Sequence, residues 1–262
     1  MVGHLLLRGM LVGLVAGLLT FAFLKVFGEP QVDRAIAFET QLDEAKAKAA
    51  AEEAKAKGLP APPEETEEAI ISRTTQAGIG LFTGVVVYCT AFGGLFALVF
   101  ALVYGRLGDL GPRAVSALLA GMGFVSVYLV PNIKYPANPP SVGETDTIAM
   151  RTALYFAMIA ISLAAMIASS MLHRRLLRRF GTWDATLIAG VAYIAVMIVV
   201  ALRLPTVNEV PESFPAVLLW QFRVASITAQ LIMWSVLGLV FGKVAEAILP
   251  ARRSSFGAAV RA

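Results

Sequence analysis

The stretch that decides the fold class is 148–172, IAMRTALYFAMIAISLAAMIASSML, in which Arg151 is the only charged residue. An apolar helix of about 20 residues crosses about 30 Å of hydrocarbon, because each residue adds about 1.5 Å. Five further stretches of this kind lie on either side of it. The predicted spans are Leu5–Phe27, Gln76–Tyr104, Ala114–Val130, Ile148–Leu172, Ala185–Leu202 and Ala216–Phe241. We therefore predict an all-α fold, a polytopic membrane helix bundle of about six transmembrane helices.

The composition of the whole chain agrees with this prediction. Of the 262 residues, 58% are hydrophobic and 15% are charged, and the mean hydropathy is +0.73. Soluble domains are about 45–50% apolar and about 25% charged. Intrinsic disorder and a collagen-like chain are excluded, and a single cysteine, Cys89, excludes a disulfide scaffold. With only His4 and His173 at the ends of apolar runs, a bis-histidine haem protein is not expected.

The acidic residues are concentrated after the first apolar run. Eleven of the eighteen lie between Glu29 and Glu68. Ala, Glu and Lys favour a helix over 31–57, Gly58 and the prolines that follow interrupt it, and a second helix is expected over 64–71. The acids could gather divalent cations, or they could only keep a helix face solvated. The predicted parts are a first transmembrane helix at 1–27, an acidic outer helical hairpin insert at 28–75, and a five-helix transmembrane bundle with a cytoplasmic tail at 76–262.

Basic residues in the short loops predict the orientation, because cytoplasmic loops are enriched in Lys and Arg. Four arginines lie within 174–179, after the fourth predicted span, whereas 204–215 contains no Lys or Arg. We therefore expect both termini in the cytoplasm. The net charge of +4 does not indicate nucleic-acid binding, because no basic patch is interleaved with aromatic residues. Gly9, Gly13 and Gly17 recur every four residues and predict close helix packing.

The three predicted outer loops share a pattern. Each begins where a span ends near a proline (Pro30, Pro131, Pro205) and finishes near an arginine (Arg73, Arg151, Arg223), with acids between. Two interpretations remain open. The loops could belong to parallel repeats that bring three arginines together at the outer end of the bundle. Alternatively, they only show the usual residues at the ends of membrane helices, with proline after a helix and arginine snorkelling at the interface. The structural ion-pair candidates are Glu29, Asp33, Arg73, Glu144, Arg151 and Glu212.

Arg223 is the residue that most requires a partner, because it lies inside a predicted span. An ionisable side chain in such a position tends to face the bundle interior and to pair with another group. We expect Glu209 or Glu212 as that partner, and simple snorkelling to the interface is the alternative. The loop 131–140, PNIKYPANPP, contains too many prolines for a regular helix. Its amides and free carbonyls could bind a partly hydrated cation, or the loop could be a rigid cap of the bundle.

No P-loop and no H-E-x-x-H motif is present, so an enzyme is not expected. The loop segments resemble the CbtA family of probable cobalt transporter subunits. The resemblance rests on 28–33 (GEPQVD), 72–78 (SRTTQAG), 134–143 (KYPANPPSVG), 208–211 (NEVP) and 218–223 (LLWQFR). It implies a bacterial cytoplasmic-membrane protein linked to cobalt uptake for cobalamin synthesis. It also implies five spans and a small single-span, histidine-bearing partner of the CbtB type.

Two functions therefore remain open, a membrane subunit that conducts Co²⁺ inward and a non-transport scaffold for another membrane protein. No cofactor is expected, since Co²⁺ would be the transported ion, and the expected partners are membrane lipid and the histidine-bearing subunit. A passing ion needs weak and multiple sites rather than a tight cage, and cobalt accepts oxygen ligands. The candidate path residues are Asn132, Tyr135, Asn138, Asn208, Glu209, Gln221 and Arg223.

Overall fold

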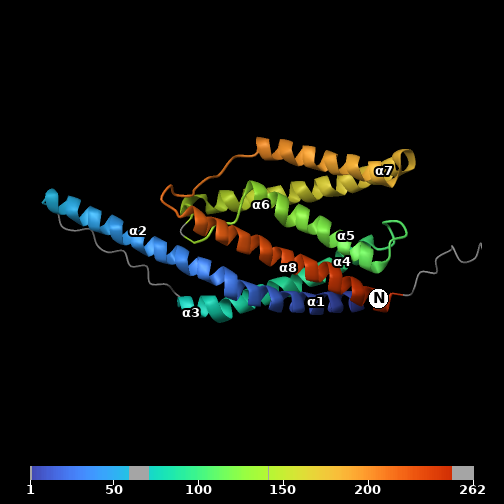
Figure 1. Ribbon diagram of the computed structural model, residues 1–262, viewed down its shortest axis with the longest axis horizontal. Coiled ribbons are helices and arrows are strands. Elements are labelled where there is room, and N and C mark those ends of the chain that lie inside the picture. The colour runs from blue at the N-terminus through green and yellow to red at the C-terminus, as the bar shows by residue number, and fades with distance from the viewer. Residues whose placement is uncertain (1, 59–70, 141, 250–262) are drawn as a thin grey trace, which may run out of the picture. The chain divides into compact units, whose positions relative to one another are not determined.

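The computed structural model describes residues 2–58, 71–140 and 142–249, and these residues form helices and no strands. Figure 1 shows the order of the elements along the chain. Five helical segments within the described residues are long and apolar enough to cross a membrane. They are Val2–Ala56, Arg73–Val103, Pro112–Lys134, Thr145–Arg203 and Ala216–Ile248. The predicted all-α membrane fold class is confirmed.

The first segment is one continuous helical run. Helix α1 (Val2–Phe23) passes through the π-helical turn η1 (Leu24–Gly28) into α2 (Glu29–Ala56). The expectation that the first helix ends near Pro30 is wrong, because this proline lies in the first turn of α2. Proline lacks the N–H that bonds to the preceding turn, and the wider π turn before it accommodates the missing bond.

The predicted outer hairpin is described only in its first half. Helix α2 accounts for that half, and Glu29 and Ala35 are its buried residues. Residues 59–70, which hold most of the expected return helix, lie outside the described residues, so the hairpin stays a prediction. The chain resumes with α3 (Arg73–Thr75), η2 (Gln76–Gly80) and α4 (Leu81–Val103). The side chain of Ser72 starts α3 by accepting a hydrogen bond from the backbone N–H of Thr75.

The third segment repeats the combination of a π turn and a proline. It comprises α5 (Pro112–Gly123), η3 (Phe124–Leu129) and α6 (Val130–Lys134). Pro131 therefore lies inside a helix, and the expected end of the span at Val130 is wrong by one helical turn. As at Pro30, a π-helical turn lies just before the proline. Its wider backbone accommodates the hydrogen bond that proline, without an N–H, cannot make.

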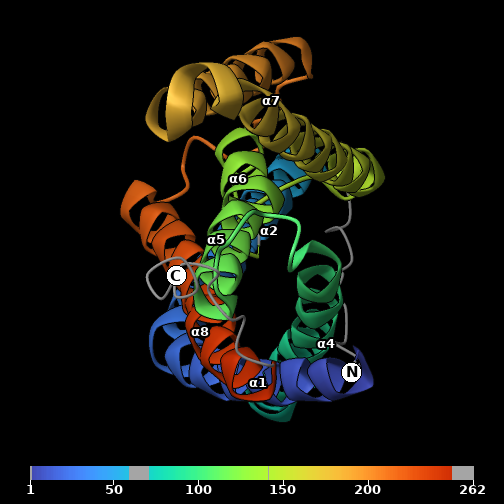
Figure 2. The same ribbon diagram turned by 90° about the vertical axis from the view of Figure 1, so that its right-hand side faces the viewer.

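The fourth segment folds back on itself. A short 3₁₀ turn, η4 (Thr145–Thr147), leads into α7 (Ile148–Arg203), which is broken at Gly181, where φ is 74° and ψ is 177°. Figures 1 and 2 both show the two arms of α7 side by side. The hydroxyls of Ser162 and Tyr193 lie 2.8 Å apart, so they join the arms. Six spans would require each arm to cross the membrane, so that count stays a prediction beside the five continuous segments.

The last segment is α8 (Ala216–Ile248). It contributes to both of the compact units into which the chain divides. One unit contains Met1–Phe21, Phe82–Phe124 and Leu231–Ala262, and the other contains Ala22–Leu81 and Val125–Gln230. The polar residues around Arg73, Arg151 and Arg223 all lie within the second unit.

Close backbone contact holds the first unit together. A Cβ atom at Gly9 would lie 2.4 Å from the carbonyl oxygen of Gly93, and one at Gly13 would lie 2.3 Å from that of Cys89. Only glycine fits at these two positions, as expected for small residues at a membrane helix interface. Along α8, Trp234 packs against Phe92 with a ring-centroid distance of 5.6 Å.

Candidate functional site

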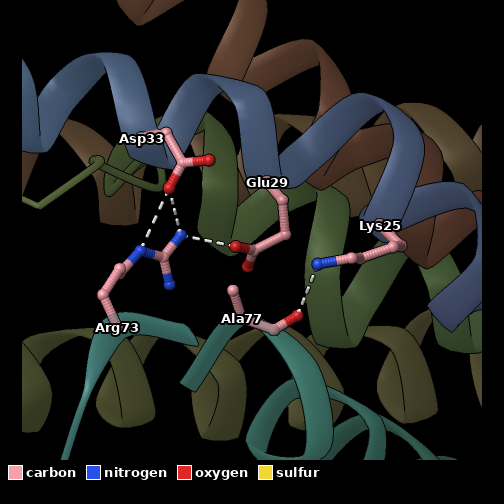
Figure 3. Close-up of polar contacts among 5 residues, drawn as sticks. All are labelled: Lys25, Glu29, Asp33, Arg73 and Ala77. Carbon is pink, nitrogen blue, oxygen red and sulfur yellow. Dashed lines mark hydrogen bonds and ion pairs between the residues drawn. The ribbon is translucent and has the colours of Figure 1, made fainter. Parts of the chain in front are cut away.

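Arg73, the first residue of α3, contacts two carboxylates of α2. Its Nη2 donates to Glu29 Oε2 and, at 2.9 Å, to Asp33 Oδ1, while its Nε donates to the same Asp33 oxygen at 3.1 Å (Figure 3). Nearby, Lys25 Nζ donates to the carbonyl oxygen of Ala77 at 3.0 Å. Glu29 and Asp33 share a face of α2 because they are four residues apart. We name Lys25, Glu29, Asp33 and Arg73 the α2–α3 clasp.

The α2–α3 clasp is balanced in charge, since it contains two cations and two carboxylates. Glu29 is only 9% exposed, and a carboxylate so far removed from water requires a charged or strongly hydrogen-bonding partner. Arg73 provides it. The clasp thus fastens the start of α3 to α2.

A second polar region is a pocket of about 630 Å³. Its walls come from the proline-rich loop, the first turns of α7, the loop that follows α7, and α8. We name it the loop pocket. It is lined by Ile133, Lys134, Tyr135, Pro136, Asn138, Val142, Ile148, Arg151, Thr152, Tyr155, Val207, Asn208, Glu209, Val210 and Arg223.

Glu209 is the carboxylate of the loop pocket. Its Oε2 lies 3.3 Å from Arg151 Nε and accepts a hydrogen bond of 2.8 Å from the backbone N–H of Glu144. A hydrogen bond from the Thr147 side chain, the Glu144 N–H and the charge of Arg151 together lower the pKa of Glu209, because each favours the ionised form. Glu209 therefore joins its own loop to the start of α7 as a carboxylate.

Arg151 sits between Glu209 and the loop that precedes α7. Its Nη2 donates to the backbone carbonyl of Glu144 at 3.1 Å, so Glu144 meets it through the main chain. Gly143, at φ 121°, lies so close that a Cβ atom there would be 2.2 Å from Arg151 Nη1. A glycine at this position allows both the backbone conformation and the approach of the guanidinium.

Arg223 points into the proline-rich loop. Its Nε donates to the carbonyl oxygen of Ala137 at 3.2 Å, and its Nη2 donates to Asn138 Oδ1 at 2.9 Å. The expected pairing of Arg223 with Glu209 or Glu212 is therefore wrong. Glu209 is held by Arg151, and Glu212 is exposed. Prolines contribute carbonyls but no N–H groups, so this loop presents acceptors that a guanidinium satisfies.

Five of the seven candidate path residues line the loop pocket. They are Tyr135, Asn138, Asn208, Glu209 and Arg223. Asn132 is a buried residue of α6, and its Oδ1 accepts a hydrogen bond from the backbone N–H of Ala137 at 3.2 Å. Gln221 is exposed, and its Oε1 accepts from Arg34 Nη1 at 3.3 Å. Neither of these two side chains lines the pocket.

The structure brings together two of the three arginines from the predicted repeat, because Arg151 and Arg223 line the loop pocket and Arg73 belongs to the α2–α3 clasp. Lys134 and Tyr155 also line the pocket, although the sequence did not mark them as candidates. Tyr155 follows Arg151 by four positions on a helix, and this spacing places both on one face. Lys134 is the last residue of α6, directly before the irregular part of the proline-rich stretch.

The charges of the loop pocket are unbalanced. Lys134, Arg151 and Arg223 are cationic and Glu209 is the acid, so the lining has a formal excess of two positive charges. Across residues 2–58, 71–140 and 142–249, no group of three or more His, Cys, Asp or Glu side chains could hold a metal ion.

The fold and the sites define a helical membrane protein whose polar residues gather at helix ends and in the loops between them. A family model described as "Probable cobalt transporter subunit (CbtA)" matches residues 2–246, and the chain belongs to this family. The family is one of transporter subunits rather than enzymes, and the word subunit implies a complex with other proteins. Comparison with curated proteins and with solved structures found no match.

Proposed function

We propose that this chain is the integral membrane subunit of a Co²⁺ uptake transporter that serves cobalamin synthesis. The observation that carries the proposal is the extent of the family match. Residues 2–246 include nearly all of the five apolar segments as well as the α2–α3 clasp and the loop pocket. A match of this extent concerns the whole membrane part rather than one local motif.

The proposed location is the bacterial cytoplasmic membrane, with both termini in the cytoplasm. The four arginines of 174–179, next to the bend of α7 at Gly181, support this orientation. It places the loop pocket and the α2–α3 clasp on the outer side, where an entering ion arrives first.

The proposed partner is a small single-span subunit that carries histidines. Cobalt prefers imidazole ligands, and the two histidines of this chain are His4 and His173. His173 Nε2 lies 3.2 Å from the Thr186 hydroxyl, in the arginine-rich part of α7. A partner that captures the metal with imidazole groups would deliver it to weaker oxygen ligands here, as conduction requires.

Within the loop pocket, Glu209 and Asn208 are the proposed oxygen contacts for the ion. Asn138 already accepts a hydrogen bond from Arg223, and Arg151 and Arg223 repel a bare dication. The two arginines therefore have a structural role in this proposal, holding the loops around the pocket. A hydrated ion suits the site better than a bare one, because water weakens the repulsion.

The proposal is tested by cobalt accumulation in cells without other cobalt uptake. Four strains would express neither protein, this chain, the histidine-bearing partner, or both. We expect accumulation above background only when both are present, and equal accumulation in all four strains would contradict a transport role.

A second measurement separates transport from scaffolding. The purified complex is placed in liposomes and metal entry is followed with a trapped cobalt-sensitive dye. We expect entry with the complex and not with protein-free liposomes. If the complex raises uptake in cells but carries no metal into liposomes, the chain is a scaffold for another transporter.

A further inference from the structure

The three cations of the loop pocket differ in what they contact. Arg151 has a carboxylate, Glu209, within 3.3 Å. Lys134 Nζ donates to the Thr206 hydroxyl at 3.3 Å, and Arg223 donates to a backbone carbonyl and an amide oxygen. Among the described residues, Lys134 and Arg223 thus contact neutral oxygens and take part in no ion pair.

Arg223 is the more costly of these two charges. It lies in α8, seven positions from the first residue of a helix of membrane length, and its side chain is partly buried. Removing a charge from water without an opposite charge nearby is unfavourable, and ionisable groups in such positions pair with a partner. Hydrogen bonds to neutral oxygens satisfy its donors without offsetting its charge.

The guanidinium of Arg223 also has N–H groups that its contacts within the described chain do not use. A guanidinium has five N–H donors in a planar fork, and the contacts within the described chain use Nε and Nη2. The Nη1 group remains available on a residue that lines the pocket. Lys134 and Arg151 line the same pocket, so an anion bound there would meet three positive side chains.

We propose that the loop pocket is an anion site that binds a phosphate group, with Arg223 as its central ligand and Lys134 and Arg151 as flanking cations. Arginine suits phosphate because its planar fork matches two oxygens at once. A phosphate with one or two negative charges would offset one or both of the two excess positive charges, and it would thereby weaken the repulsion between these side chains and a cation at Glu209. The volume of about 630 Å³ leaves room for a phosphate with substituents.

The rim of the pocket indicates where such a phosphate comes from. Ile133 and Ile148 line it and are 73% and 53% exposed, and Trp220 on α8 is 69% exposed. Trp220 precedes Arg223 by three residues on α8, and tryptophan is enriched at the membrane interface, where lipid phosphates lie. A phospholipid headgroup and inorganic phosphate share the recognised chemistry, and they are separated by experiment.

The test uses the purified full-length chain. In one arm it is reconstituted into nanodiscs of a phosphate-free galactolipid with increasing phosphatidylglycerol, and retained lipid is counted by native mass spectrometry. In the other arm inorganic phosphate is titrated into the chain in a zwitterionic detergent. We expect selective retention of phosphatidylglycerol, or saturable binding of inorganic phosphate, and either result supports the site while identifying the source of the phosphate.

The variant Arg223→Gln should weaken binding about tenfold or more, since hydrogen bonds to charged groups are among the strongest. The matched control is Arg203→Gln, which removes the same charge from an exposed residue at the end of α7 and should leave binding unchanged. Lys134→Gln is a second variant for use if Arg223→Gln does not fold, and it should weaken binding less.

Three results would overturn the proposal. The first is the absence of both phosphatidylglycerol selectivity and phosphate binding in the wild-type chain. The second is an equal loss of binding in Arg203→Gln and Arg223→Gln, which would indicate general attraction to the positive surface. The third is unchanged binding in Arg223→Gln and Lys134→Gln. None of these measurements involves cobalt, so they do not depend on the transport function.

Discussion

Arg73 and Arg223 both lie close to the first residue of a helical segment of membrane length, but their surroundings differ. Arg73 meets two carboxylates in the α2–α3 clasp. Arg223 meets a backbone carbonyl and an amide oxygen in the loop pocket. The clasp compensates its charges within the protein, whereas the pocket leaves positive charge for something else to compensate. The difference separates a structural fastener from a candidate binding site.

The largest effect is expected from Arg73→Gln. The substitution leaves Glu29, which is 9% exposed, without its cation. An unpaired carboxylate at such a site costs about 2–3 kcal/mol, measured as the change in the free energy of unfolding or as a lowered melting temperature in detergent.

A matched control and a double variant sharpen this prediction. Arg34→Gln removes an exposed arginine whose partners are the amides of Gln31 and Gln221, and it should have little effect. Adding Glu29→Gln to Arg73→Gln should recover part of the lost stability, because the unpaired charge is gone. If the double variant is less stable than Arg73→Gln alone, charge compensation is not what holds the clasp.

Gly143→Ala should have the next largest effect. At φ 121° a side chain is strained, and its Cβ would collide with the Arg151 guanidinium. We expect a loss of about 1–3 kcal/mol from the backbone conformation, together with displacement of Arg151 from Glu209. Gly190→Ala on α7 is the control, because a Cβ there has no neighbour within 4 Å. Equal stability of the two variants would contradict the tight fit at Gly143.

The helices could largely be predicted from the sequence, because apolar runs of membrane length are a strong signal. The continuity of α1 with α2 could not, since a proline inside a helical pattern ordinarily ends or kinks the helix, and the π-helical turn that precedes Pro30 has no recognisable sequence signal. The close packing at Gly9 and Gly13 follows from their spacing. Gly80 and Gly84 have the same spacing of four residues, but a Cβ at Gly84 would meet nothing within 4 Å. Spacing alone therefore does not say which glycines contact a neighbour.

The candidate site could be predicted only in part. Arg73, Glu29 and Asp33 were grouped from their order along the chain, and the structure brings them together. Arg223 was expected to pair with Glu209 or Glu212, the acids of the loop that precedes α8. The loop that carries Glu209 turns instead toward Arg151, and side-chain partners across three loops depend on tertiary structure that local patterns do not contain.

Glu209→Gln tests the one carboxylate of the loop pocket. The pKa of Glu209 is lowered from its ordinary value of 4.5, so the ionised group contributes stability above that value, which is lost as pH falls through the lowered pKa. We expect the melting temperature of the wild-type chain to fall as the pH is lowered from above 4.5 through the lowered pKa of Glu209, and to fall less in the variant.

The same variant should lower cobalt accumulation in cells that also express the partner, if Glu209 contacts the ion. Glu212→Gln is the matched control, since Glu212 is an exposed acid on the same loop. Unchanged accumulation at limiting cobalt in Glu209→Gln would remove this residue from the ion path. Equal losses in both variants would indicate that the loop only attracts cations through its general charge.

Arg223→Gln should have the smallest effect on stability, within about 1 kcal/mol of the wild-type chain, the usual net value of a hydrogen bond. The substitution leaves no carboxylate unpaired, and the new amide can still donate to Ala137 or Asn138. Removal of an uncompensated charge from a membrane-length helix also offsets the lost hydrogen bonds. Thermal unfolding of this variant beside Arg73→Gln, in the same phosphate-free detergent, measures the difference directly. A loss in Arg223→Gln as large as that in Arg73→Gln would mean that the protein already compensates both arginines, and the loop pocket would then have no unbalanced charge to bind an anion.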